Sequence, residues 1–186
     1  MDWTKIKAAT IDLDVDTNRL ENELKNIPND RWGSYIHQSG HEWKSMFINK
    51  NSTEVFKDFK TAKMIPHSDW YWDETLDTPY LKELVESLPM KNIGMIRAFI
   101  LNGPLVMHTD SNETTPVELN YNLGLTIATK MEGPMQMAGC GPIEGYNVLF
   151  NDSIEHGFPN GVGEQISLRI FGDFDYDKFK VIRIYE

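Results

Sequence analysis

The second half of the chain consists of short apolar segments separated by glycine and proline, a pattern that few folds can accommodate. Turn sequences such as Asn102-Gly103-Pro104 and Glu132-Gly133-Pro134 end two of the segments. The expected strands cover residues 93–101, 105–108, 119–129, 135–138, 146–150, 165–171 and 179–184. Short strands at even spacing are typical of a β-sandwich or a jelly roll rather than of a parallel sheet.

The first 90 residues carry helical signals instead. Asp16-Thr17-Asn18 offers capping residues for a helix that Pro28 ends, and Thr78-Pro79 begins a second helix that ends before Pro89. The stretch between them, residues 31–73, holds four tryptophans and is expected to be irregular or mixed. We therefore expect a mainly β fold with flanking N-terminal helices (α+β), built as a double-stranded β-helix, or jelly roll, of the cupin-like type.

The length of the chain predicts a single domain. Its 186 residues are enough to bury one core, and 40% hydrophobic with 25% charged residues is ordinary for a globular protein. We expect one domain over residues 1–186, with a mostly helical or irregular buttress over 1–90 and the jelly-roll core over 91–186.

Charge and cysteine content argue against several classes of protein. The formal net charge of −10 repels phosphate backbones, so a nucleic-acid partner is not expected. Cys140 is the only cysteine, so no internal disulfide can form, which suits a reducing compartment. The first residues lack the apolar region of a signal peptide, and no apolar run approaches the roughly 18 residues of a membrane span. The sequence predicts a cytoplasmic protein with no membrane partner.

Three side chains in the strand-rich half form a metal-ligand pattern. His108-Thr-Asp110 ends one expected strand, and His156 comes after a later one. Two imidazoles and one carboxylate make up the facial triad that holds non-haem Fe(II) and leaves positions open for O2 and a cosubstrate. Arg169, on the next strand, carries a guanidinium that matches a carboxylate of a dicarboxylate such as 2-oxoglutarate. The pattern predicts that the triad binds the catalytic Fe(II) and that the arginine binds the cosubstrate.

Each of these residues also has an ordinary structural interpretation. The chain holds a second such triplet, His67-Ser-Asp69, so one His-x-Asp is weak evidence. His156 could be a core histidine, Asp110 could close an Asx turn, and Arg169 could pair with the acidic stretch 173–177. The metal interpretation is favoured because the ligands and the arginine follow one another in the required order on successive strands.

Motifs around these residues are similar to those of one known family. Phe150-Asn-Asp-Ser-Ile-Glu-His156 resembles a distal-histidine strand, and Leu123-Gly-Leu-Thr-Ile127 resembles the strand that follows a first metal ligand. Arg169-Ile-Phe-Gly-Asp-Phe-Asp175 resembles a segment that opens with a cosubstrate-binding arginine. The family is that of the aspartyl/asparaginyl β-hydroxylase-like Fe(II)/2-oxoglutarate-dependent oxygenases, and the resemblance covers about residues 75–175.

This resemblance implies a jelly roll that uses Fe(II), 2-oxoglutarate and O2. It implies hydroxylation of a C–H bond of an amino acid or amino-acid side chain, with release of succinate and CO2. It also implies that His108 and His156 are ligands and that Arg169 binds the distal carboxylate of 2-oxoglutarate. The chain departs from the family where a basic pair is expected, because Asn120 and Asn122 stand there. Their amides are expected to hold the proximal end of the cosubstrate more weakly than cations do.

Further candidates concern the substrate, expected to be a small molecule or a peptide, and the support of the histidines. Arg97, within the expected strand 93–101, is expected to face the cavity and bind a carboxylate. Trp70 offers an aromatic wall, although such residues more often only pack, and Glu113 in the loop after the triad could meet a cationic group. Asp152 and Glu155 are the candidates for orienting the imidazoles.

Two other functions remain open on the sequence. The first is a cupin-like metalloenzyme that does not use 2-oxoglutarate, against which Arg169 argues. The second is a catalytically inactive jelly-roll binding module. The complete triad argues against a module, because unused buried imidazoles and carboxylates cost desolvation energy.

Overall fold

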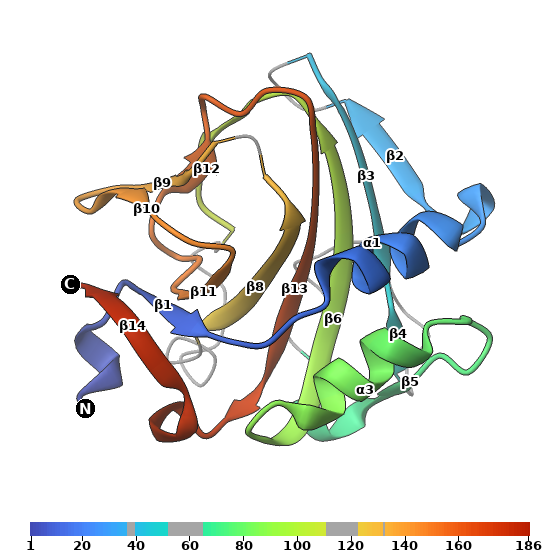
Figure 1. The fold of residues 1–186 in the computed structure, drawn as a ribbon, viewed down its shortest axis with the longest axis horizontal. Helices are drawn as coiled ribbons and strands as arrows, with labels where there is room; N and C mark the ends of the chain where they lie inside the picture. The colour runs from blue at the N-terminus through green and yellow to red at the C-terminus, as the bar shows by residue number, and fades with distance from the viewer. Residues whose placement is uncertain (37–39, 52–64, 111–122, 132) are drawn as a thin grey trace.

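The computed structural model describes residues 1–36, 40–51, 65–110, 123–131 and 133–186. Within these ranges, most strands belong to one eight-stranded antiparallel sheet (Figure 1). In spatial order the strands are β14 (Lys180–Tyr185), β1 (Ala8–Asp12), β11 (Asn147–Phe150), β8 (Gly124–Lys130), β13 (Glu164–Phe174), β6 (Met90–Asn102), β3 (Glu42–Phe47) and β2 (Gly33–Ile36).

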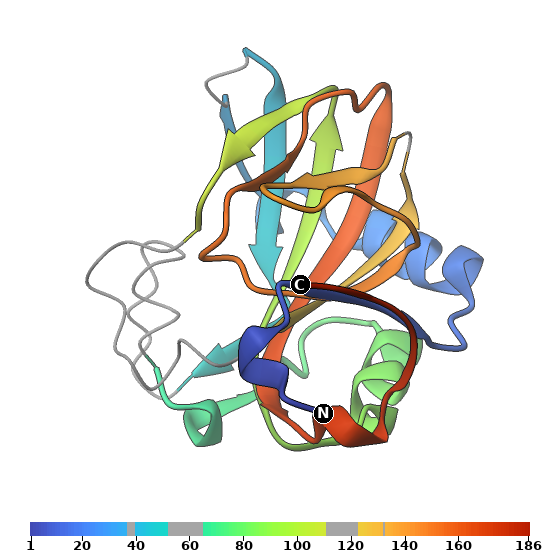
Figure 2. The ribbon, with the colours of Figure 1, turned by 90° about the vertical axis from the view of Figure 1, so that its left-hand side faces the viewer.

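A second antiparallel sheet, of four strands, lies against one face of the large sheet and is turned toward the viewer in Figure 2. Its strands are, in order, β10 (Gly141–Ile143), β9 (Met135–Met137), β12 (His156–Phe158) and β7 (Leu105–His108). Met135 and Met137 of β9 pack with Val148 and Phe150 of β11 in a buried cluster between the sheets. Two antiparallel sheets closed over a shared interior form a double-stranded β-helix, so the expected jelly roll is confirmed.

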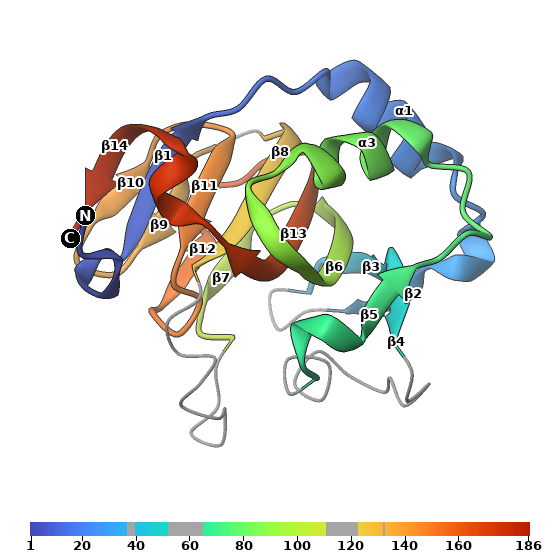
Figure 3. The ribbon, with the colours of Figure 1, turned by 90° about the horizontal axis from the view of Figure 1, so that it is seen from below.

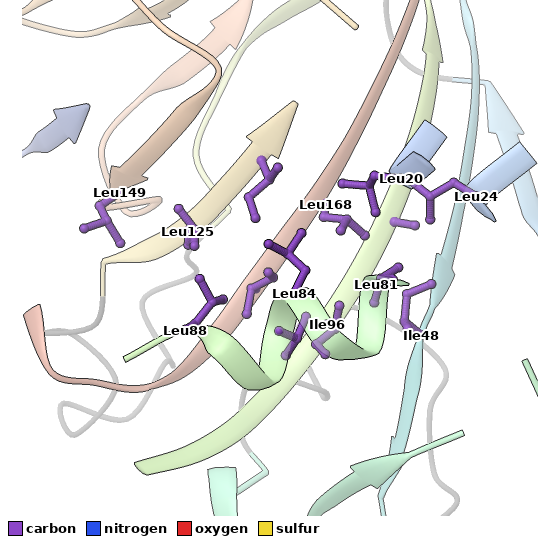
Figure 4. Packing of buried hydrophobic residues seen from close by; sticks show 14 of the residues in the cluster. Leu20, Leu24, Ile48, Leu81, Leu84, Leu88, Ile96, Leu125, Leu149 and Leu168 are labelled. Atoms are coloured by element: carbon purple, nitrogen blue, oxygen red, sulfur yellow. The ribbon is translucent and has the colours of Figure 1, made fainter. Parts of the chain in front are cut away.

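Two α-helices, α1 (Thr17–Asn26) and α3 (Pro79–Ser87), cover the other face of the large sheet (Figure 3). Figure 4 shows Leu20 and Leu24 of α1 and Leu84 of α3 packed over the strands, and all three are buried. Burying each such side chain stabilises the fold by about 2 kcal/mol. The carboxylate of Glu23 accepts the backbone N–H of Tyr80 and of Leu81, each at 2.8 Å, which caps α3 from α1.

Both helices begin where the capping residues predict. The Asp16 carboxylate accepts the Arg19 N–H at 3.0 Å, and Pro79 stands in the first turn of α3. No helix in the described part of the chain is long and apolar enough to cross a membrane.

Residues 1–90 hold both expected helices, but they also contain strands that the sequence did not predict. They contribute β1, β2 and β3 to the large sheet, and a separate two-stranded sheet is formed by β4 (Asn49–Asn51) and β5 (Trp70–Trp72). These strands are three to six residues long, too short to show a clear alternation of polar and apolar side chains. Their strand conformation comes from pairing with distant strands, as when β3 pairs with β6.

Strand β13 lies near the middle of the large sheet and is buried on both faces. Ile166, Leu168 and Ile170 point to the helices and belong to the main hydrophobic cluster. The alternate positions, including Ser167 and Arg169, point to the small sheet, because side chains alternate along a strand. A charged residue on this strand therefore projects into the interior of the jelly roll.

The buried carboxylate of Asp73, next to β5, is expected to matter for stability. It accepts hydrogen bonds from Arg31 at 2.6 Å and from the Thr75 hydroxyl at 2.6 Å, and Lys50 lies 2.9 Å away. Burial alone would raise the pKa of Asp73, but the contacts with Thr75, Lys50 and Arg31 outweigh it and lower the pKa. Asp73→Asn should therefore destabilise the protein by roughly 2–3 kcal/mol at neutral pH.

The effect should depend on pH in one direction. A carboxyl group whose folded pKa is depressed stabilises the fold above its unfolded pKa, about 3.9, and loses this contribution as the pH falls further. Denaturant unfolding of wild type and Asp73→Asn should thus give a difference at pH 7 that shrinks below about pH 4. Asp69→Asn, at an exposed carboxylate nearby, serves as the control and should change little. A constant difference down to pH 2 would contradict the role of the charge.

Candidate metal centre

Pairing of β7 with β12 brings the two histidines together. His108 and His156 are register partners at the adjoining ends of these strands, with ring centroids 4.8 Å apart. Gly157 permits the close pairing, because a Cβ atom there would lie 2.7 Å from the carbonyl oxygen of Val106. Asp110 follows β7, and its backbone N–H donates to the carbonyl of Asp152 at 3.0 Å. The fold thus joins segments far apart in the sequence at one point of the interior.

The carboxylate of Asp110 lies between the two imidazoles. Its Oδ1 is 3.3 Å from Nε2 of His108, and its Oδ2 is 3.6 Å from Nε2 of His156. One potential ligand atom from each residue lies within 4.8 Å of the others. Among the described residues, this is the one group of three histidine, cysteine or acidic side chains close enough to share a metal ion. The triad that the sequence predicts is therefore assembled in space.

Backbone carbonyls orient both imidazole rings. Nδ1 of His108 lies 2.9 Å from the carbonyl oxygen of Val106, and Nδ1 of His156 lies 2.8 Å from that of Ile154. A carbonyl oxygen only accepts, so Nδ1 must carry the proton, and the Nε2 lone pair faces the site. The expectation that Asp152 and Glu155 orient the rings is wrong, since each ring is instead held by the backbone two residues before it.

Electrostatics at the site favour a cation. Burial would lower the pKa of His108, but the hydrogen bond and the charge of Asp110 outweigh burial and raise it. A nearby carboxylate that stabilises an imidazolium also stabilises a metal ion, and protons compete with the metal for the same nitrogen. Metal binding at this site should therefore weaken as the pH falls.

Arg169, on β13, lines the same pocket as the two histidines and Asp110. Its side chain is 5% exposed, so an ion pair with the surface stretch 173–177 does not account for it. Nη1 donates to the carbonyl of Gly124 at 2.8 Å and to the hydroxyl of Thr126 at 3.2 Å, and the guanidinium carbon lies 3.6 Å from the centre of the Phe150 ring. Burial lowers the pKa of Arg169, while the charges of Asp152 and Asp110 act against this change.

Gly124 makes room for the guanidinium. A Cβ atom at this position would lie 2.6 Å from Cζ and 2.7 Å from Nη2 of Arg169, closer than atoms can approach without movement. Asp152 lies 3.7 Å from Nη2 and supplies a counter-charge. The cation is thus held in one position by a glycine, a stacked ring, backbone carbonyls and a carboxylate.

One pocket joins the triad and the arginine. Its polar lining comprises His108, Asp110, Thr126, His156, Ser167 and Arg169. Its apolar lining comprises Trp43, Phe99, Leu101, Leu105, Met135, Phe150 and Phe158. A mostly apolar pocket with a few converging polar groups is typical of a small-molecule site.

The structure places the residues that were predicted to contact the substrate in different surroundings. Arg97 does face the interior, because it is the register partner of Arg169 across the β6–β13 pair. Trp70 is buried with Met95 and Phe171 in a separate hydrophobic cluster and is not among the described residues that line the pocket. In the described part of the chain it packs against Met95 and Phe171, and its proposed contact with the substrate stays a prediction.

Three other candidates lie outside the described residues, namely Glu113, Asn120 and Asn122. Their proposed contacts with the substrate and with the proximal carboxylate of 2-oxoglutarate stay predictions. The second His-x-Asp triplet is described, and it forms the 3₁₀ helix η3 (His67–Asp69). There His67 Nδ1 lies 2.8 Å from Oδ1 of Asp173, which makes a local pair outside the pocket.

Several residues that line the pocket belong to no motif that the sequence alone would reveal. Thr126 and Arg169 are register partners, and Ser167 shares the face of β13 with Arg169. Once Arg169 is placed on a strand, Ser167 can be inferred to point to the same face, since alternate residues along a strand share a face. Trp43 could not be inferred in this way, because β3 was not expected as a strand.

No family model and no curated protein sequence matches the chain. A similar solved structure is the crystal structure of an oxidoreductase of the 2OG-Fe(II) oxygenase family from Burkholderia pseudomallei. It is 12% identical in sequence, the match covers 89% of this chain and 81% of that chain, and the TM-score is 0.48. At this level of identity, the site has to be judged on its own geometry.

Proposed function

We propose that the protein is an Fe(II)- and 2-oxoglutarate-dependent dioxygenase of the aspartyl/asparaginyl β-hydroxylase-like kind. It hydroxylates a C–H bond of an amino acid or of an amino-acid side chain and releases succinate and CO2. The observation that carries the proposal is the convergence of two Nε2 atoms on one carboxylate, in a pocket that also holds a buried arginine.

The donor set fits Fe(II). His108, Asp110 and His156 offer two neutral nitrogens and one carboxylate oxygen, and their protonation is already suited to a metal because each Nδ1 faces a carbonyl. Three protein ligands on one side leave the remaining positions to small molecules, which is the pattern of non-haem iron oxygenases.

The floor of the pocket fits a dicarboxylate. Nε of Arg169 is buried without a hydrogen-bond partner among the described residues, so a donor is available there. The Thr126 hydroxyl accepts from Arg169, and its own proton can be donated to an anion. A buried cation beside a hydroxyl group suits the distal carboxylate of 2-oxoglutarate better than any neutral ligand.

Each part of the pocket has a role in this reaction. When bound, Fe(II) supplies the oxidative chemistry that couples decarboxylation of 2-oxoglutarate to hydroxylation of the substrate. Arg169 and Thr126 orient the cosubstrate, and Asp110 offsets the charge of the metal. Phe150 and the other apolar side chains exclude water, which strengthens the electrostatic contacts inside the pocket.

Succinate formation tests the proposal. Protein purified without oxygen receives Fe(II) and 2-oxoglutarate and is then exposed to air, and wild type is compared with His108→Ala and Arg169→Ala. Even without the natural substrate, wild type should form succinate slowly, and both variants should fall to background. Calorimetry of 2-oxoglutarate binding to the Fe(II)-loaded protein without oxygen adds a measurement that does not depend on turnover.

The counter-charge of Asp152 favours one alternative, a cupin-like metalloenzyme that does not use 2-oxoglutarate. Because Asp152 lies 3.7 Å from Arg169, the buried cation has a partner even without a cosubstrate. Metal binding without any binding of 2-oxoglutarate would support this alternative. Absence of metal binding would instead indicate a binding module without catalysis.

A further inference from the structure

Two arginines leave the same face of the large sheet and then diverge. Arg97 and Arg169 are register partners on β6 and β13. Arg169 turns toward β8 and β11, where it contacts Gly124 and Phe150. Arg97 turns toward β3, where its Nη2 donates to the hydroxyl of Ser45 at 2.8 Å. The interior therefore holds two cationic positions on opposite sides of the β6–β13 pair.

Aromatic rings flank the guanidinium of Arg97. Its Cζ lies 5.3 Å from the centre of the Phe47 ring and 5.0 Å from that of the Phe99 ring. Rings on its flanks and a hydrogen bond at its edge restrict a guanidinium to few orientations, and this reduces the entropy lost when it binds a ligand. Phe99 also lines the pocket, so Arg97 contacts a side chain that forms part of the pocket wall.

The two histidines lie over different halves of the pocket. His156 is beside Phe150, with ring centres 4.7 Å apart, and Phe150 in turn stacks on Arg169. The ring centres of His108 and Trp43 lie 6.3 Å apart, and those of Trp43 and Phe99 lie 5.8 Å apart. The half with Arg169 and Thr126 suits the cosubstrate. The half with Trp43 and Phe99 leads from the triad to Arg97.

We propose that Arg97 binds a carboxylate of the substrate, and that Trp43 and Phe99 hold an apolar part of the substrate between this carboxylate and the metal ligands. The proposal rests on the proposed function and specifies the substrate class as a carboxylic acid with an apolar body. A guanidinium fork binds a carboxylate bidentately, and aromatic walls bind an aliphatic or aromatic chain. The net charge of −10 would repel such an anion elsewhere on the protein, so a local cation is needed to admit it.

The test compares matched acids and amides. Leucine, phenylalanine and methionine are each offered as the free amino acid, as the N-acetyl acid and as the carboxamide, to Fe(II)- and 2-oxoglutarate-loaded protein without oxygen. Binding is measured by calorimetry, and stimulation of succinate formation is measured after exposure to air. We expect at least one acid to bind wild type about 10- to 100-fold more tightly than its amide. The N-acetyl acids distinguish a free amino acid from a peptide end as the source of the carboxylate.

Two variants isolate the contribution of Arg97. Arg97→Gln removes the charge and keeps a donor for Ser45, and it should abolish the preference for acids. It should weaken binding of 2-oxoglutarate much less than it weakens binding of the acids. Lys44→Gln removes a neighbouring cation whose position on β3 alternates with Ser45 and so faces away from the pocket, and it should keep the preference. Arg97→Lys, which keeps the charge without the fork, should be intermediate.

Three results would overturn the inference. In the first, no acid binds wild type better than its amide. In the second, Arg97→Gln weakens 2-oxoglutarate as much as it weakens the acids, which would assign Arg97 to the cosubstrate. In the third, Arg97→Gln lowers the unfolding temperature but keeps the preference, which would make Arg97 structural. Failure of the proposed function is distinguishable, because the acid preference of metal-free protein can be followed by tryptophan fluorescence without 2-oxoglutarate.

Discussion

Replacing His156 by alanine is expected to weaken binding of a divalent metal by more than about 100-fold and to stop succinate formation. His156 is buried, and its Nε2 is one of three donors that face a common point. Loss of the supporting contact of a metal-bound histidine alone typically costs 10- to 100-fold in metal affinity, so loss of the ligand itself should cost more. Calorimetric titration with Co(II), which resists oxidation in air better than Fe(II), measures the change directly.

His67→Ala is the matched control for this experiment. His67 belongs to the other His-x-Asp triplet, and its Nδ1 contacts Asp173 rather than the pocket. Its loss should lower stability somewhat but leave Co(II) affinity within about threefold. Equal loss of affinity in both variants would mean that the metal does not bind at the triad. Thermal unfolding of each variant checks that the fold is retained.

The grouping of the three candidate metal ligands could be predicted from the sequence because it depends on residue type and order. His108-Thr-Asp110 ends a strand that the sequence places at residues 105–108, where β7 is found. The distal position was harder to place, because His156 opens a strand of only three residues that shows no periodicity. The pairing of β12 with β7 depends on the backbone approach at Gly157, which is a long-range contact.

The support of the site could not be predicted in the same way. The groups that orient the imidazoles are backbone carbonyls, which every residue has, so no side chain marks them. Trp43 enters the pocket because β3 pairs with β6 in one particular register. The register between distant strands is set by how two whole surfaces fit together, which a local sequence pattern does not contain.

Gly124→Ala, which adds one methyl group, is expected to lower the affinity for 2-oxoglutarate strongly. The new Cβ would lie 2.6 Å from Cζ of Arg169 and 2.8 Å from Cε1 of Phe171, so both side chains must shift. The backbone at Gly124 lies outside the left-handed region, so alanine itself is tolerated there. Displacing a buried cation from the anion that it binds costs about 2–5 kcal/mol, which corresponds to a loss of about 30-fold or more in affinity for 2-oxoglutarate.

Metal binding separates this effect from general damage to the site. Gly124 does not contribute a ligand atom, so Gly124→Ala should keep its affinity for Co(II) within about threefold of wild type while its affinity for 2-oxoglutarate falls. Gly33→Ala is the matched control, since it is also a strand glycine, and its added Cβ would meet a carbonyl oxygen at an ordinary 3.5 Å. That control should behave like wild type in both titrations.

The contrary outcome is equally specific. If Gly124→Ala binds 2-oxoglutarate as tightly as wild type, then the position of Arg169 does not determine cosubstrate binding, even though the guanidinium has been moved. Arg169 would then act mainly as the ion-pair partner of Asp152, which lies 3.7 Å away. The alternative of a metalloenzyme that does not use 2-oxoglutarate would be favoured. Arg169→Lys separates the two cases further, because a lysine can keep a charge pair with Asp152 but cannot grip a carboxylate with a planar fork.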